Sequence, residues 1–400
     1  MVTGHRRHGA VHLFAGLVAF GSVAVVLLGA EMAAVRLERT TVRVSAPELF
    51  PLKNQGLAFQ RAAVRSPGIL PLYGSSELTA VLVPERAHIF FRTAPTGFQV
   101  SPVGAGGADS LIMLQKVAAL GSDLRGKKVA ISLSPGWFLK PGPGWLRGYN
   151  GNFSLMAASE MAFGPALDFK LKRDIARRML KYPGTLEKSP LLEFALKRLA
   201  SGRWLDRLVF CALWPIGEVQ TSILDLQDHL AASRYIRHKV KPVAAFDPGM
   251  PDWSKLIASA DATKTADTDP ATNASRIVPE RAIDSPDASF RRRMDTSAAW
   301  IDLDLLLRTL ARVHASPLLF TMPIAGDLYD RKGVSRSARE DYYSKLRALV
   351  QRYHFRLVEF EGHDEDPEFL YRHQSHLTAK GWIYYDRALD DFFHGRTPRS

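Results

Sequence analysis

Cysteine is almost absent from this sequence: among its 400 residues, Cys211 is the single example. An intramolecular disulfide is therefore excluded, and so is a zinc site built from several thiolates. Cys211 lies in the apolar run 208–214, where no base or cation is present to activate its thiol. We therefore predict a small, buried hydrophobic side chain rather than a nucleophile.

Long uncharged apolar stretches are also scarce. The stretch from Leu13 to Ala30 is long enough to cross a bilayer, since a helix of about 18 residues spans about 27 Å. Arg6 and Arg7 precede it, so the positive-inside rule places the N-terminus in the cytoplasm and the main domain outside. A cleaved signal peptide stays open as the alternative, because residues 28–30 resemble a weak cleavage site. We expect a single-pass anchor in the cell membrane.

The composition excludes global disorder, since 46% of the residues are hydrophobic and 23% are charged. It fits one large domain or two smaller ones. The formal net charge of +13 suits an anionic membrane surface, an anionic polymer or nucleic acid. The basic residues are dispersed and no nucleic-acid-binding motif is present. A membrane-proximal role is therefore favoured, and nucleic-acid binding is not expected.

Strand and helix patterns alternate along much of the chain. Strand character is found at 69–73, 128–133, 317–322 and 355–360, and three of these segments are continuous apolar runs that end in a turn residue. Helical periodicity is found at 109–120, 301–313 and 337–353. This alternation predicts an α/β fold with a doubly wound parallel sheet.

The predicted organisation has six parts. The stretch 153–257 interrupts the alternation with helical patterns, and its apolar segment 204–216 is predicted to be a core helix of the soluble domain. Asp, Thr, Ala, Ser and Pro then dominate a predicted linker. In chain order, we expect an N-terminal tip and anchor (1–31), a neck (32–68), the first part of the sheet domain (69–152), a helical insertion (153–257), the linker (258–300) and the second part of the sheet domain (301–394).

A candidate nucleophile follows the first predicted strand, in the sequence Gly74-Ser75-Ser76-Glu77. Open α/β sheets bind ligands beyond the carboxyl ends of their strands. A serine in a tight turn between a strand and a helix has an exposed hydroxyl close to backbone N–H groups, which suits nucleophilic attack. The alternative is a serine that caps a helix, with Glu77 complementing the helix dipole.

The candidate base is His376, which lies in a polar loop after the last predicted strand and before a C-terminal helix. That loop leaves the same edge of the sheet as the Ser76 turn, so the two side chains could meet. A surface or capping histidine stays open as the alternative. His363, Asp364, Asp366 and His373 lie nearby in sequence, but their spacing is a weak indication of a metal site, and no metal is expected.

Several short motifs in order resemble the DltD family, the membrane-anchored proteins with an SGNH-hydrolase-like domain that act in D-alanylation of teichoic acids. The resemblance covers roughly residues 10–394. It is carried by Gly74-Ser75-Ser76-Glu77-Leu78, Val103-Gly104-Ala105-Gly106-Gly107, Ser134-Pro135-Gly136-Trp137-Phe138, Met322-Pro323 with Tyr342-Tyr343, and His376-Leu377 followed by Lys380-Gly381-Trp382.

The resemblance implies a flavodoxin-like, three-layer α/β/α fold and roles for individual residues. Ser76 aligns with the nucleophile, with Ser75 as the fallback, and His376 aligns with the base. Gly104 or Gly107 would supply a backbone N–H to an oxyanion hole together with the backbone of Ser76.

Two positions depart from the family pattern. His373 replaces the expected Asp ahead of His376, so Asp366 or Glu368 would have to act as the acid, or the pair would work as a dyad. Gly136 replaces a Gln in the middle motif.

The resemblance also implies a function outside the cytoplasm. We expect an acyl-ester transferase or hydrolase of SGNH type that needs no cofactor and takes part in D-alanylation of a cell-envelope glycan. Its partners would be a membrane-bound O-acyltransferase (DltB-like) and an acyl carrier protein (DltC-like) or an acylated intermediate. Two alternatives stay open: an acetyl esterase or acetyltransferase for an exopolysaccharide, and a non-catalytic scaffold with a degenerate site that binds the carrier.

Overall fold

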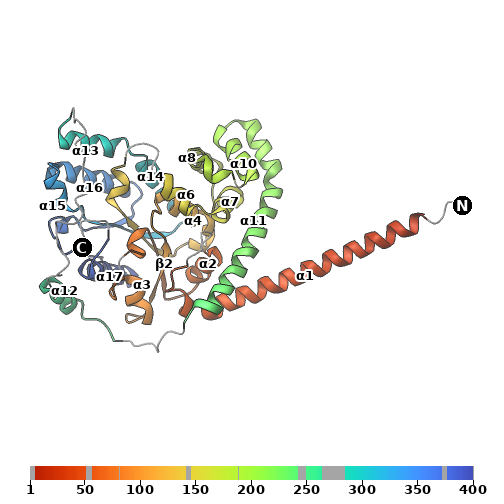
Figure 1. The fold of residues 1–400 in the computed structure, drawn as a ribbon, viewed down its shortest axis with the longest axis horizontal. Helices are drawn as coiled ribbons and strands as arrows, with labels where there is room; N and C mark the ends of the chain where they lie inside the picture. The colour runs from red at the N-terminus through yellow and green to blue at the C-terminus, as the bar shows by residue number, and fades with distance from the viewer. Residues whose placement is uncertain are drawn as a thin grey trace.

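The computed structural model shows one parallel sheet flanked by helices, with a long N-terminal helix that projects away from the body (Figure 1). The structure describes residues 5–50, 56–80, 82–140, 146–187, 189–241, 249–263, 284–371 and 376–399. The strands are β1 (Ile69–Gly74), β2 (Gln99–Gly104), β3 (Lys128–Leu133), β4 (Ser316–Thr321) and β5 (Arg356–Glu359).

The five strands lie in the order β2-β1-β3-β4-β5, and every pair is parallel. This is the flavodoxin-like order, in which the direction of winding reverses beside β1. Gly74 is paired with Gly104 at the carboxyl ends of β1 and β2. The predicted α/β class with a parallel sheet is therefore confirmed, and the reversal point lies at the predicted nucleophile turn.

Alternate residues of each strand enter two separate cores, one on each face of the sheet. Tyr73, Ile131 and Leu319 pack on one face against α4 (Ser110–Leu120), α14 (Ala299–Arg312) and α16 (Arg336–Gln351). Leu72, Ala130 and Phe320 pack on the other face against α3 (Ala87–Phe90) and α17 (Ala379–Phe393). Both faces are thus covered, which explains why the central strands β1, β3 and β4 are largely apolar.

All four predicted strands are present, but β2 was not predicted as a strand. Its sequence contains Gln99, Ser101 and Pro102, so it lacks the continuous apolar run of the other buried strands. Proline is tolerated there because β2 is an edge strand of this sheet.

The helices between β3 and residue 241 form a cluster against the first core. These helices are α5 (Pro135–Phe138), α6 (Leu146–Asn152), α7 (Leu155–Phe163), α8 (Phe169–Met179), α9 (Pro183–Leu186), α10 (Pro190–Ser201) and α11 (Trp204–Lys239). The remaining elements are α2 (Leu57–Arg65), α12 (Trp253–Ala262), α13 (Pro286–Asp295), α15 (Gly326–Arg331) and the short 3-10 helices η1 (Ser76–Leu78), η2 (Phe91–Thr93), η3 (Gly121–Leu124) and η4 (Glu361–His363).

The predicted linker 258–300 needs a correction. It contains the end of α12, all of α13 and the start of α14. Ser285 caps α13 by accepting a hydrogen bond from the Ala288 N–H, and Pro286 occupies the first turn. The polar composition of this segment therefore concealed a capped helix.

The N-terminal helix α1 (His5–Ser45) is 41 residues long and includes the predicted anchor. Within the described residues, it is the one helix that is long and apolar enough to cross a membrane. Its apolar side chains between Leu13 and Leu28 are exposed, whereas Ala34, Glu38 and Val42 are buried against the domain. A single-pass anchor is compatible with this division of the helix.

Two predictions about α11 are wrong. Cys211 is exposed rather than buried, and so are Leu208 and Ile216 of the predicted core segment 204–216. The buried residues follow a single stripe that includes Asp206, Phe210 and Gly217, so only one side of this apolar helix packs against the domain.

Candidate functional site

The candidate site begins at the turn that follows β1. Ser75 is 2% exposed, whereas Ser76 is half-buried and opens η1. The carboxylate of Glu77 accepts a hydrogen bond from the Ser75 N–H at 2.8 Å. Burial raises the pKa of Glu77 to about 7, and the Ser75 hydrogen bond partly offsets that effect. The buried Glu77 carboxyl thus stabilises the turn, and the Ser76 hydroxyl is more accessible than that of Ser75.

The loop after β2 packs directly against this turn. Gly104 has a φ of +154°, and a Cβ added there would lie 2.0 Å from the carbonyl oxygen of Gly74. The close approach of the two strand ends therefore requires glycine. Farther along the loop, a Cβ on Gly106 would meet the Ser76 Cβ at 3.9 Å, so Gly106 faces the candidate nucleophile.

The peptide unit between Gly106 and Gly107 makes hydrogen bonds through both its N–H and its carbonyl group. Its N–H, on Gly107, donates to the Ser75 Oγ at 3.1 Å. Its carbonyl, on Gly106, accepts from the Asn152 Nδ2 at 3.1 Å. Hydrogen bonds on both sides of one peptide polarise it and fix its orientation. The Gly107 N–H is consequently already used by the Ser75 hydroxyl. The Ser76 N–H, in contrast, donates no hydrogen bond within the described part of the chain.

His376 lies beyond β5, in a segment whose ends are joined by a Leu370–Leu377 bridge. Its carbonyl accepts a hydrogen bond from the Tyr371 N–H at 2.8 Å. Among the described residues, no hydrogen bond joins the Ser76 hydroxyl to the His376 ring. Such bonds often lengthen in the absence of substrate.

Arg86 contacts the serine turn, and its charge acts on the pKa of His376. This guanidinium is 2% exposed, and its Nη1 donates to the carbonyl of Leu78, at the end of η1, at 2.9 Å. Burial lowers the pKa of His376, and the positive charge of Arg86 lowers it further. A lowered pKa favours the neutral imidazole, which is the form that accepts a proton.

Asp366, the first candidate acid, is held by partners other than His376 in the described part of the chain. Asp366 pairs with the Lys380 Nζ at 2.9 Å and with the His363 Nδ1 at 3.4 Å. Burial acts to raise the pKa of Asp366, but the hydrogen bonds from His363 and Lys380 bring it down to about 2. Glu368 donates its N–H to Asp366, and its carbonyl accepts from the Thr378 Oγ1. His373 lies outside the described residues.

The loops after β4 and β5 are joined by the half-buried carboxyl of Asp364. Asp364 accepts hydrogen bonds from the Tyr343 hydroxyl at 2.5 Å and from the Ile324 N–H at 2.9 Å. Thr321, the last residue of β4, shares a hydrogen bond with the Tyr342 hydroxyl at 2.9 Å. Hydrogen bonds therefore hold the Tyr342-Tyr343 pair against the carboxyl end of β4 and the Met322-Pro323 turn that follows it.

Three residues that the sequence analysis did not assign to the site bear on it. Asn152 was noted in no catalytic motif, Arg86 lies between elements, and Glu77 was interpreted as a helix-dipole partner. Asn152 lies 46 residues after Gly106 in the sequence, so no local pattern could place it beside that glycine. In the described part of the chain, no group of three or more His, Cys, Asp or Glu side chains could hold a metal ion.

Comparisons with known proteins agree with the sequence motifs. A family model described as "DltD protein" matches residues 46–394. The Protein DltD of Bacillus subtilis (strain 168) is 29% identical over 373 residues, which cover 88% of this chain and 89% of the relative. The Protein DltD of Staphylococcus aureus (strain NCTC 8325 / PS 47) is 23% identical over 350 residues, 85% of each chain. The chain that carries this serine turn and this long N-terminal helix therefore belongs to the DltD family.

Proposed function

We propose that this protein is a membrane-anchored acyl-ester transferase or hydrolase that acts outside the cytoplasm in the D-alanylation of teichoic acid. Membership of the DltD family supports the pathway. The observation that supports the chemistry is the half-buried Ser76 at the carboxyl end of β1, facing the glycine loop after β2. The partners would be a membrane-bound O-acyltransferase and a carrier protein or acylated intermediate.

The proposed reaction has two steps. The Ser76 Oγ attacks the carbonyl carbon of an acyl donor, and His376 takes the hydroxyl proton and passes it to the leaving group. A hydroxyl of the acceptor glycan, or water, then attacks the acyl-Ser76 ester. His376 removes the proton of that nucleophile and returns it to Ser76 as the ester bond breaks.

The negative charge that develops on the carbonyl oxygen needs donors close to Ser76. The Ser76 N–H carries no hydrogen bond in the described structure, and the neighbouring Gly106 faces this residue. Gly107 has a different role here, because its N–H holds the Ser75 hydroxyl. We infer that the fixed Gly106–Gly107 peptide shapes the wall of the oxyanion site, with Asn152 and Ser75 as positioning residues.

Ser76→Ala tests the nucleophile in the purified full-length chain. Turnover of a D-alanyl ester should fall by at least about a thousandfold, because the attacking atom is lost. Ser75→Ala should keep measurable turnover and lose about ten- to a hundredfold, because it removes one positioning hydrogen bond. Ester hydrolysis measured by released D-alanine reads out both variants.

Unchanged turnover in Ser76→Ala and in Ser75→Ala would overturn the covalent mechanism. Turnover of an acetyl ester, measured beside that of a D-alanyl ester, distinguishes the two proposed substrates. Faster turnover of the acetyl ester would support an acetyl esterase or acetyltransferase instead. Full complementation of a deletion strain by Ser76→Ala would favour a scaffold.

A further inference from the structure

The outer face of α11 is apolar and has no partner among the described residues. Leu208, Val219 and Ile223 are 57%, 61% and 54% exposed. Soluble domains rarely expose a continuous apolar strip of this kind. We define the α11 strip as the exposed residues Trp204, Leu205, Leu208, Ala212, Pro215, Ile216, Val219, Ser222, Ile223 and Leu230.

Charge is nearly absent from this part of the helix. Between Leu208 and Leu224, the one charged residue is Glu218, which is directed inward. Its charge acts on the pKa values of Glu160 and Lys172 in the helical cluster, and its Oε1 is buried. The strip is therefore uncharged over about 24 Å of helix. Such a surface requires an apolar or interfacial environment.

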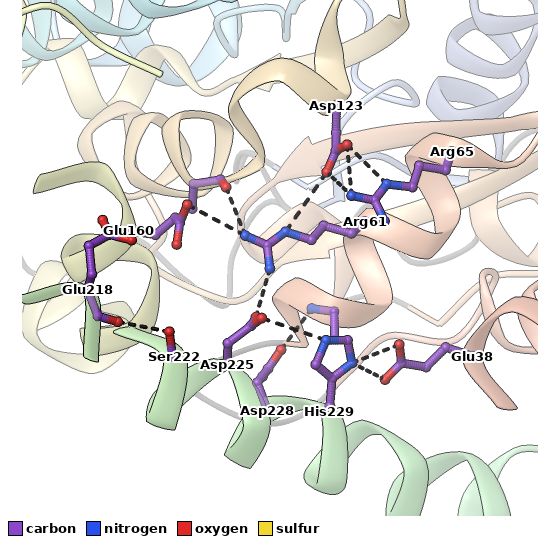
Figure 2. Close-up of polar contacts among 12 residues, drawn as sticks. Glu38, Arg61, Arg65, Asp123, Glu160, Glu218, Ser222, Asp225, Asp228 and His229 are labelled. Atoms are coloured by element: carbon purple, nitrogen blue, oxygen red, sulfur yellow. Dashed lines mark hydrogen bonds and ion pairs between the residues drawn. The ribbon is translucent and has the colours of Figure 1, made fainter. Parts of the chain in front are cut away.

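Polar contacts fix α1 against α11, as Figure 2 shows. The His229 Nδ1 on α11 lies 2.9 Å from the Glu38 Oε1 on α1. Burial acts to lower the pKa of His229, but the hydrogen bond and charge of Glu38 raise it overall. The two helices are thus joined by a buried pair close to where α1 leaves the domain.

Contacts with α2 complete this junction. The Arg61 Nη1 pairs with Asp225 of α11 at 2.7 Å, and Asp228 accepts the Ala58 N–H at 2.8 Å. The direction of α11 relative to α1 is therefore set by helices on both sides. In Figure 1, α11 rises on the side of the body toward which α1 projects.

We propose that the α11 strip lies in the headgroup layer of the same bilayer that α1 enters, so that the domain meets the lipid surface at two places. This inference depends on the proposed anchoring role of α1. Both helices expose apolar side chains away from the junction, between Leu13 and Leu28 on α1 and along the strip on α11. Exposed Arg203 and Arg207 at the start of α11 supply the positive charge that an anionic lipid surface attracts.

Single-cysteine fluorescence quenching in the full chain tests this arrangement. Because Cys211 is the one native cysteine, a Cys211→Ala background accepts one label at a time. Val219→Cys reports on the strip, Leu17→Cys on the anchor, and Ser337→Cys on the exposed surface of α16. Each variant carries an environment-sensitive fluorophore and is reconstituted into vesicles of phosphatidylglycerol and phosphatidylcholine.

Lipids with a nitroxide on the upper acyl chain should quench most of the fluorescence at positions 17 and 219, whereas iodide should quench position 337. Quenching at 17 but not at 219 overturns the inference while leaving the anchor intact. Protection of position 219 from both quenchers also overturns it, because that result indicates a protein contact. Absence of lipid quenching at 17 would instead refute the anchor itself.

Discussion

Two adjacent serines, Ser75 and Ser76, have different environments, and this difference favours different roles for them in the proposed mechanism. The Ser75 hydroxyl is buried and holds the Gly107 N–H, so it is committed to the architecture of the loop. Ser76 is half-buried beside Gly106. A nucleophile must be reachable by its substrate, so the structure supports Ser76 over Ser75 within the proposed mechanism.

Arg86 provides a prediction about the pH dependence of turnover. Burial and the Arg86 charge both lower the pKa of His376. Arg86→Gln removes the charge, so the pKa of His376 should rise and the acidic limb of kcat/KM should move to higher pH. Ester turnover measured between pH 5 and 8 shows this directly.

Arg86→Lys keeps the charge and should restore the wild-type limb, provided that thermal melting shows both variants folded. Arg92→Gln is the matched control, since Arg92 pairs with Glu48 and its charge acts on His88 instead. An unmoved acidic limb in Arg86→Gln would show that another group controls the base.

The sequence could single out Ser76 and His376 because Ser76 directly follows the first strand pattern and His376 lies in the loop after the last one. Asn152 and Arg86 could not be placed, because they reach the site through contacts between distant segments. Asn152 comes from α6 and meets the Gly106 carbonyl across the loop, and Arg86 meets the Leu78 carbonyl. Local patterns carry no information on such contacts.

At the scale of elements, burial decided which strands could be predicted. β3 and β4 are central and apolar, so their sequences identify them. β2 lies at the edge, where Pro102 is tolerated and the apolar run is interrupted. For α11 the prediction overestimated burial. Its apolar residues predicted a core helix, but only one stripe of it is buried.

The junction between α1 and α11 yields a prediction about stability. The pKa of His229 is raised in the folded chain, so the charged pair with Glu38 stabilises the fold fully below the ordinary histidine value of 6.5. That contribution is lost as the pH rises through the raised pKa. Glu38→Gln should therefore lower the free energy of unfolding by about 1–3 kcal/mol near pH 6 and by less at higher pH.

Thermal melts of the full chain in detergent, recorded from pH 5.5 to 9, measure this difference. Glu48→Gln is the matched control, because it breaks an ion pair with Arg92 that contains no histidine. A Glu38→Gln deficit that stays constant across this pH range would show that His229 is not the titrating partner.

At the scale of the whole molecule, the parts suit work at a surface. The net charge of +13 is spread over the chain, and α1 projects from one side of the body (Figure 1). A single span would tether the domain but would leave it free to rotate, because the helix end alone fixes no face toward the bilayer. A second contact along α11 would restrict that rotation and hold the site at one height above the lipid.

This arrangement predicts that docking and chemistry can be separated. Val219→Asp combined with Ile223→Asp places two charges on exposed positions of α11, where the fold should tolerate them. Turnover of a small soluble ester should stay at the wild-type level, since neither residue lies near Ser76 in the described contacts. Transfer to an acceptor embedded in vesicles should fall about tenfold or more, because the site is no longer held at the lipid surface. Val219→Ala with Ile223→Ala is the uncharged control, and equal losses on soluble and embedded substrates would show that α11 supports the fold rather than docking.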